Sequence, residues 1–183
     1  RFLGFLGMTM VTVFVLYLPS SFTPNFLQNQ QFYPESTIGF LGAVGSLGNA
    51  IAVLALGNLQ PVLAFMIGQA WVLVFTVLFL NGNSPVWFGL GYFFYGGYRL
   101  SKSMILAISR SMIHPGETGL AYGMVETVSA IGVIIAPIVA GILYKHDAWS
   151  IYRIPLFLIA GVMVLNFIIF RIIRRRKINA HTV

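Results

Sequence analysis

The sequence lacks cysteine entirely and has little charge of either sign. Without a thiol the chain cannot form a disulfide, a thiolate metal site or a cysteine nucleophile. Only 8% of its 183 residues are charged, and just four of them are Asp or Glu. A typical soluble domain carries about 25% charged residues. These absences exclude an ordinary water-soluble domain, and the 58% content of hydrophobic residues supports the same conclusion.

The sequence also lacks the motifs of common membrane-bound and nucleotide-dependent enzymes. It contains no HExxH zinc motif, no GxxxxGK[ST] phosphate loop and no GxGxxG fingerprint opening a helix after a strand. An intramembrane serine hydrolase needs a histidine base at membrane depth, whereas His114, His146 and His181 all fall in expected loops or the tail. Three such histidines do not approach a metal cluster. We therefore expect a protein that is not an enzyme and has no metal and no cofactor.

What the sequence does contain is a set of six long apolar stretches. A helix that crosses a hydrocarbon core of about 30 Å needs about 20 mostly apolar residues, and each stretch comes close to that length. The sequence therefore predicts an all-α, polytopic membrane protein with six transmembrane helices. The predicted spans are Phe2–Leu18, Ser36–Gly57, Val62–Leu80, Val86–Ile108, Gly119–Tyr144 and Ile154–Ile173.

The formal net charge of +7 comes largely from one basic run after the last apolar stretch. Five of the eleven basic residues lie within Arg171–Lys177, and such a run favours the cytoplasmic side and anionic lipid headgroups. We expect residues 1–173 to form the membrane bundle and residues 174–183 to form a basic cytoplasmic tail. Six spans then place both ends of the segment in the cytoplasm, most simply at the plasma (inner) membrane. Nucleic-acid binding is not expected, because the chain has no soluble module to carry it.

The first residues give a further expectation about the natural protein. Arg1 stands directly before an apolar stretch, with no Met and no charged leader that ends in a small-residue cleavage site. A signal peptide is therefore not expected. We expect instead that a segment N-terminal to Arg1 is missing from this sequence.

Two of the predicted spans have unusual backbones. Pro19 and Pro24 follow the first span, and they predict either a broken helix that continues at membrane depth or a simple end at the interface. The second span has a face that is nearly bare backbone, which favours close helix packing. The small residues on or beside this face are Gly39, Gly42, Ala43, Gly45, Ser46, Gly48 and Ala50.

The fourth span places two phenols and two cations on one helical stripe. Tyr92, Tyr95, Arg99 and Lys102 occur at positions i, i+3, i+7 and i+10. A cation near the bilayer centre costs about 2.5–3.5 kcal/mol on insertion scales, so this stripe should face the bundle interior or a watery cavity. Glu126 is the only acid within a span. Helical rise brings both cations close to its depth in the membrane.

Three interpretations of these charges remain open. Glu126 can form a neutralising pair with Arg99 or Lys102 that only holds the helical hairpin together. Alternatively, these residues form a substrate or proton site, in which Arg99 takes an anionic group or Glu126 titrates. In the third interpretation the charges are solvated and never meet. Substitutions at Arg99 and Glu126 separate these roles.

The fifth span carries a second set of small residues, interrupted by a proline. Gly132, Ala136 and Ala140 form a stripe, and Gly141 follows it. Pro137 frees the carbonyl four residues earlier and bends the helix. These five residues predict a helix-packing surface. Two lone polar residues on the third and sixth spans are expected to form local hydrogen bonds: Gln69 and Asn166.

Several of these features resemble the C-terminal six-helix half of a major facilitator superfamily transporter. The proline-interrupted first span and the following Glu35–Gly39 resemble the seventh helix, the outer loop and the start of the eighth helix of that family. His114–Gly123 is similar to the cytoplasmic turn that leads into its eleventh helix. The stretch Gly132–Gly141 resembles the GxxxGPxxGG pattern. Gly57–Pro61, however, replaces the charged G-x-x-x-D-R-x-G-R-K loop, so a charge-relay latch is not expected here.

The resemblance implies a twelve-helix protein whose two six-helix bundles rock about a midplane site. This chain would supply one bundle, and its partner would be the missing N-terminal half. The first and fourth spans would line the central cavity, the second and fifth would meet the other half, and the third and sixth would lie outside. Tyr92, Tyr95 and Arg99 would then bind a small organic solute. The alternatives are a non-catalytic membrane subunit or scaffold, and a half-size transporter that acts as a dimer.

Overall fold

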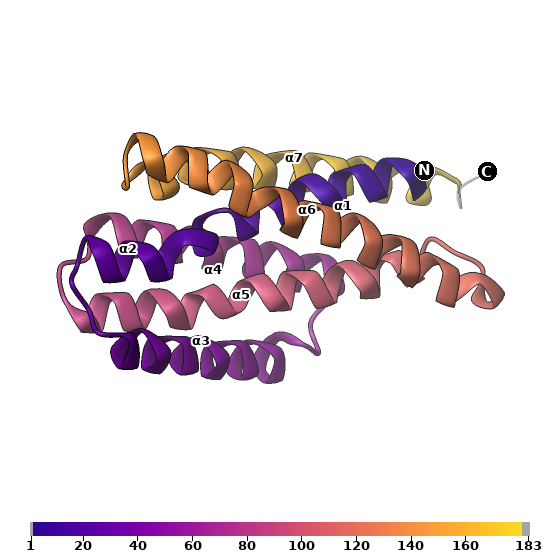
Figure 1. Ribbon diagram of the computed structural model, residues 1–183. Helices are drawn as coiled ribbons and strands as arrows, with labels where there is room; N and C mark the ends of the chain where they lie inside the picture. Colours follow the sequence, from indigo (N-terminus) through magenta and orange to yellow (C-terminus); the bar gives the residue numbers. More distant parts are fainter. Residues whose placement is uncertain (1, 181–183) are drawn as a thin grey trace.

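The computed structural model describes the backbone of residues 2–180 and their side chains except at positions 115 and 173–180. Within this part of the chain every regular element is a helix (Figure 1). All side chains of the expected basic tail, residues 174–183, lie outside the described part, and the tail stays a prediction. In chain order the elements are α1 (Phe2–Tyr17), η1 (Pro19–Phe22), α2 (Thr23–Asn29), α3 (Glu35–Leu56), α4 (Pro61–Asn81), α5 (Pro85–Arg110), η2 (Pro115–Glu117), α6 (Thr118–His146) and α7 (Ser150–Ala180).

The long helices match the predicted spans to within a few residues at most ends, and their starts have a local cause. Pro61 and Pro85 begin α4 and α5, positions where the missing N–H of proline costs no helical hydrogen bond. Pro34 precedes α3 in extended conformation. α7 differs from its predicted span, since it begins four residues earlier, at Ser150, and runs on to Ala180 through the basic run.

The first span is broken rather than terminated. α1 gives way to the short 3-10 helix η1, and α2 then carries the chain on to Asn29, so that the whole segment is 28 residues long. Hydroxyl groups bond to carbonyls around the break: Ser20 Oγ donates to the carbonyl of Tyr17 at 2.9 Å, and Thr23 Oγ1 donates to that of Pro19 at 2.8 Å. Such bonds let a proline-broken helix persist at membrane depth.

The helices form two groups of three that pack side by side. In one group α5 lies between α3 and α4, and in the other α1 lies between α6 and α7 (Figure 1). The two groups are joined where α4 packs on α7 and where α5 touches both α1 and α6. This arrangement places α5, with its cations, near the middle of the bundle.

Five of the long helical segments are both long and apolar enough to cross a membrane, and α5 is the exception. The fourth predicted span is the one that does not meet this criterion, because Arg99, Lys102 and Arg110 lower its hydropathy. Its 26 residues would nevertheless extend about 39 Å, enough for a hydrocarbon core of about 30 Å. With α3 and α4 packed on either side, α5 can span while presenting little polar surface to lipid.

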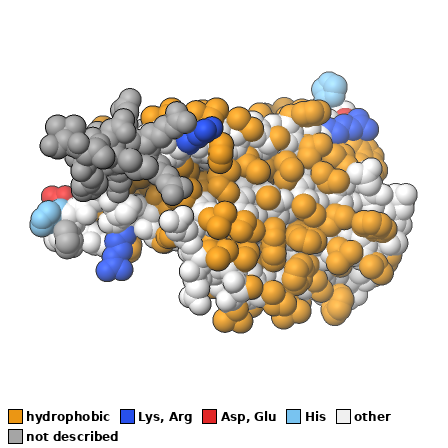
Figure 2. Space-filling model, turned by 180° about the vertical axis from the view of Figure 1, so that it is seen from behind, with side chains coloured by type: hydrophobic (Ala, Val, Ile, Leu, Met, Phe, Trp, Pro, Cys, Tyr) orange, Lys and Arg blue, Asp and Glu red, His pale blue; other side chains and the backbone are white. Residues whose placement is uncertain are grey.

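The outer face of the bundle is suited to contact with lipid. Figure 2 views the molecule from the side of α4 and α7, which lie behind the other helices in Figure 1, and hydrophobic side chains dominate this face. Charged side chains gather at its two ends. The largest exposed apolar residues of α7 include Phe157, Val164 and Phe167. A patch of this extent on a soluble monomer would mark an interface, and here it marks the lipid boundary.

Glycines set the close approach of α3 and α5. A Cβ atom added at Gly48 would overlap the backbone of Phe93, and one added at Gly96 would overlap the backbone of Gly48 and Asn49. Gly39 and Gly42, in contrast, have nothing within 4 Å of such an atom. Of the small residues of the second span, Gly45 and Gly48 are the glycines that face α5 closely. The stripe of Gly39, Ala43, Ser46 and Ala50 is exposed.

Replacing Gly48 by alanine is expected to lower the free energy of unfolding by about 1–3 kcal/mol, because the new methyl group has no room beside the Phe93 backbone. The matched change Gly39→Ala should be neutral or slightly stabilising, since alanine is the better helix former. Thermal unfolding of the two purified variants in the same detergent measures the difference. Equal midpoints for both variants would show that the two helices are not held at this distance.

The small residues of α6 pack against the broken first helix. A Cβ atom at Gly132 would stand 2.9 Å from the carbonyl oxygen of Met10, and one at Gly141 would stand 3.2 Å from the ring of Phe22. Ala136 and Ala140 are fully buried and pack with Leu18. Pro137 lies inside a continuous α6. Close approach at small residues is the expected basis of association between membrane helices.

A buried polar cluster joins α1, α4 and α7. The side-chain amide of Asn166 donates to Thr12 Oγ1 and to Gln69 Oε1, both at 3.1 Å, and all three residues are fully buried. Gln69 and Asn166 thus form hydrogen bonds, as expected, but they do so across helices. In an apolar medium an unpaired amide is costly, so two polar residues on neighbouring helices gain by turning toward each other.

Candidate functional site

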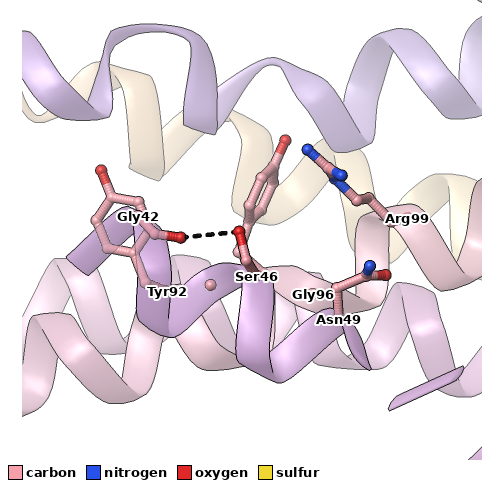
Figure 3. Close-up of a pocket in the computed structure, with 8 residues that line it drawn as sticks. Gly42, Ser46, Asn49, Tyr92, Gly96 and Arg99 are labelled. Carbon is pink, nitrogen blue, oxygen red and sulfur yellow. Dashed lines mark hydrogen bonds between the residues drawn. The ribbon is translucent and has the colours of Figure 1, made fainter. Parts of the chain in front are cut away.

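A cavity of about 190 Å³ lies between α3 and α5. Figure 3 shows that its labelled side chains come from the facing surfaces of these two helices. Glycine backbone forms part of the wall on both sides, which leaves room for a small molecule where larger residues would fill the space. The lining residues are Gly42, Gly45, Ser46 and Asn49 from α3 and Tyr92, Tyr95, Gly96 and Arg99 from α5.

The three residues that the sequence predicts as substrate ligands line this one cavity. Tyr92, Tyr95 and Arg99 occupy successive turns of α5 and face the space beside α3. Their shared surface follows from helical periodicity. Their role as ligands stays a prediction. The second span, rather than the first, supplies the opposite wall, which differs from the arrangement that the family resemblance implied.

The broken first helix instead positions one of the cavity residues. Ser20 Oγ in η1 donates to the hydroxyl oxygen of Tyr95 at 2.5 Å. The Tyr95 ring stacks on Tyr98, with centroids 5.6 Å apart and planes within 7°, and it also meets Phe75 at 5.1 Å. A phenol held at its hydroxyl and on its faces has little freedom to reorient. The interruption after α1 therefore helps to fix one wall of the cavity.

Arg99 brings a positive charge to the cavity. Among the residues that the structure describes, the ion pairs involve Lys102 and Arg153 but not Arg99. Figure 3 shows the guanidinium of Arg99 and the phenol of Tyr92 on the same side of α5. A guanidinium is always protonated and presents five donors in a planar fork, which suits carboxylate and phosphate groups.

Sequence reasoning missed Asn49, which also lines the cavity. Its side-chain oxygen is buried and has no hydrogen-bond partner within the described part of the chain. A buried, unpaired amide oxygen is uncommon in native structures and calls for a partner. The signal was available in the sequence, since Asn49 is the only amide in a span otherwise made of small and apolar residues. Asn49 therefore joins Arg99 and the tyrosines as a candidate ligand.

Glu126 pairs with Lys102. The Nζ atom of Lys102 on α5 lies 2.7 Å from Oε2 of Glu126 on α6, and the two side chains are 34% and 47% exposed. This contact links the two groups of three helices close to the cavity, since Lys102 follows Arg99 by one turn. The pair is half-exposed, so water screens much of its attraction. Because Lys102 takes the carboxylate, Arg99 keeps its charge for another partner.

The described residues contain no group of three or more His, Cys, Asp or Glu side chains placed to hold a metal ion. What the cavity offers is a guanidinium, two phenols, a hydroxyl and an amide. These groups can bind and orient a polar solute. They include no nucleophile paired with a base.

The long helices and their apolar outer face define a polytopic helical membrane protein, with a cationic cavity between α3 and α5. The chain belongs to the major facilitator superfamily, whose family model matches residues 1–182. Members of this superfamily are membrane transporters and not enzymes. Neither the curated proteins nor the solved structures provided a match.

Proposed function

We propose that this chain forms one six-helix half of a secondary active transporter that moves a small organic solute by alternating access. The chain would supply the C-terminal half, and an N-terminal six-helix half would complete the protein. The exposed small-residue stripe of α3 supports this proposal, because it offers a smooth face on which another bundle can pack and slide. The segment would lie in the plasma (inner) membrane, with both of its ends in the cytoplasm.

The observation that carries the proposal is the cation in the cavity between α3 and α5. Arg99 lines that cavity while the nearby carboxylate of Glu126 is occupied by Lys102. The surplus positive charge favours a solute with a carboxylate or phosphate group. Asn49 also lines the cavity, and its side-chain amide is a further candidate contact for the solute. The cavity of about 190 Å³ would be one part of a larger site completed by the other half.

Reconstituted vesicles test this function directly. The product of the complete natural reading frame is placed in liposomes without ATP, and uptake of labelled small organic anions is measured with and without a proton gradient. We expect saturable uptake that a proton ionophore reduces, because the proton gradient is the only energy source for accumulation against the solute's own gradient. A protein that packs correctly but takes up none of a broad panel of anions and zwitterions would instead support the scaffold interpretation.

A further inference from the structure

A second, larger hollow lies on the outer side of the bundle, where α4 begins, α5 ends and α7 passes with Phe167, Phe170 and Arg171. Its volume is about 580 Å³, within the range of roughly 300–1,000 Å³ that small-molecule sites occupy. It is separate from the cavity between α3 and α5. The apolar part of its wall consists of Val62, Met66, Ala107, Ile108, Phe167 and Phe170.

One edge of this hollow, which we call the outer groove, carries positive charge. Arg171 lines it and is exposed, and neither ion pair among the described residues includes it. The next two turns of α7 add Arg174, Arg175, Arg176 and Lys177 in the sequence. Arg171 is the member of this run whose side chain the structure places at the groove, and an anion entering the groove gains attraction from it.

The start of α4 reinforces this charge. Gln60 precedes α4 and lines the groove, but its side chain does not cap the helix. The first N–H groups of an uncapped helix attract anions, and the helix dipole acts in the same direction. The end of α5 also faces the groove, with the opposite polarity. There the N–H and the hydroxyl of Ser111 both donate to the carbonyl oxygen of Ile108, at 3.1 and 2.8 Å. These bonds satisfy that carbonyl, so it does not face the anion unpaired.

We propose that the outer groove binds an anionic phospholipid. Its phosphate would lie between Arg171 and the start of α4, and one acyl chain would lie along Phe167, Ile108 and Met66. The groove combines a charged edge with an apolar wall. It lies beside the start of α4 and the end of α5, the depth at which headgroups meet acyl chains. A water-soluble anion would leave the apolar wall exposed, and a zwitterionic lipid would gain less from the positive edge.

Lipid titration of the full-length protein tests the charged edge. Native mass spectrometry in detergent compares phosphatidylglycerol with phosphatidylcholine of identical chains. Arg171→Gln is expected to weaken the tightest phosphatidylglycerol site about fivefold, as for one basic residue near a membrane surface, and to change phosphatidylcholine binding little. Arg110→Gln is the matched control, because Arg110 ends α5 outside the groove. If both variants weaken phosphatidylglycerol binding equally, the effect comes from the overall charge of the protein, and the proposal of a lipid site in the outer groove is wrong.

The apolar wall is tested with a second matched pair. Phe167→Ala removes a ring from the groove, whereas Phe157→Ala removes a ring from the same helix that is 76% exposed and lies outside the groove. Only Phe167→Ala should weaken phosphatidylglycerol binding. Glycerol phosphate, which has no acyl chain, should not compete with the lipid. If Phe167→Ala has no effect while charge removal does, the lipid is held by the basic run alone and the groove is not its site.

Discussion

Replacing Arg99 by alanine is expected to reduce transport by the full-length protein about 30-fold or more while leaving membrane insertion intact. Arg99 lines the cavity between α3 and α5, and the ion pairs of the described residues do not include it. Arg99 is exposed in this chain alone, and the proposed other half would cover it in the full-length protein. Truncating a buried charge that hydrogen-bonds its partner costs about 2–5 kcal/mol, and every 1.4 kcal/mol is a factor of ten. Initial uptake rates in vesicles, normalised to the amount of inserted protein, measure the loss.

Arg110→Ala provides the matched control, because it removes the same side chain from the end of the same helix, outside the cavity. Arg99→Lys should retain part of the activity, since it keeps the charge but not the bidentate fork. A transported anion and its uncharged amide analogue should be distinguished by the native protein and not by the alanine variant. Unchanged uptake in Arg99→Ala would remove this residue from the substrate site.

The helices could be predicted because the membrane imposes a simple rule on the sequence. A spanning segment must satisfy its own backbone hydrogen bonds and keep apolar side chains over a fixed length, so both the type and the bounds of each helix can be inferred. α5 departs from the apolar part of that rule because its neighbours cover it. The same stripe of Tyr92, Tyr95 and Arg99 that lowers its hydropathy located the candidate cavity.

Side-chain partners could not be predicted, because they depend on how each helix is rotated about its axis. Depth along the membrane left Arg99 and Lys102 equally able to reach Glu126, and only the packing of α5 on α6 selects Lys102. The contact between Gln69 and Asn166 is of the same kind, since it joins residues 97 positions apart. Asn49 was overlooked because the glycines around it suggested packing alone.

The pair between Lys102 and Glu126 joins the two groups of helices at a point one turn from the cavity. A proton on Glu126 would cancel its attraction for Lys102 and loosen that link, which couples the charge state of one carboxylate to the position of α6 against α5. A solute in the cavity would therefore meet α5 and α6 in different relative positions when Glu126 is protonated and when it is charged.

Glu126→Gln is accordingly expected to abolish uphill accumulation of solute and to leave exchange down its own gradient within about threefold of the native rate. Glutamine keeps the size of the side chain but cannot gain or lose a proton, so the gradient loses its means of driving the cycle. Exchange needs only the cavity and its movement between the two sides. Counterflow and gradient-driven uptake, measured on the same vesicles, separate these two activities.

Two further variants decide whether the carboxylate acts as a proton carrier or as a structural tie. Glu117→Gln removes the exposed acid that precedes α6, outside the cavity and the ion pair, and it should leave both activities unchanged. Lys102→Met breaks the same pair but keeps the titratable group, so gradient-driven uptake should fall less than in Glu126→Gln. If Lys102→Met and Glu126→Gln instead reduce uptake and exchange equally, the pair only holds α5 to α6, and the proton must be carried elsewhere in the protein.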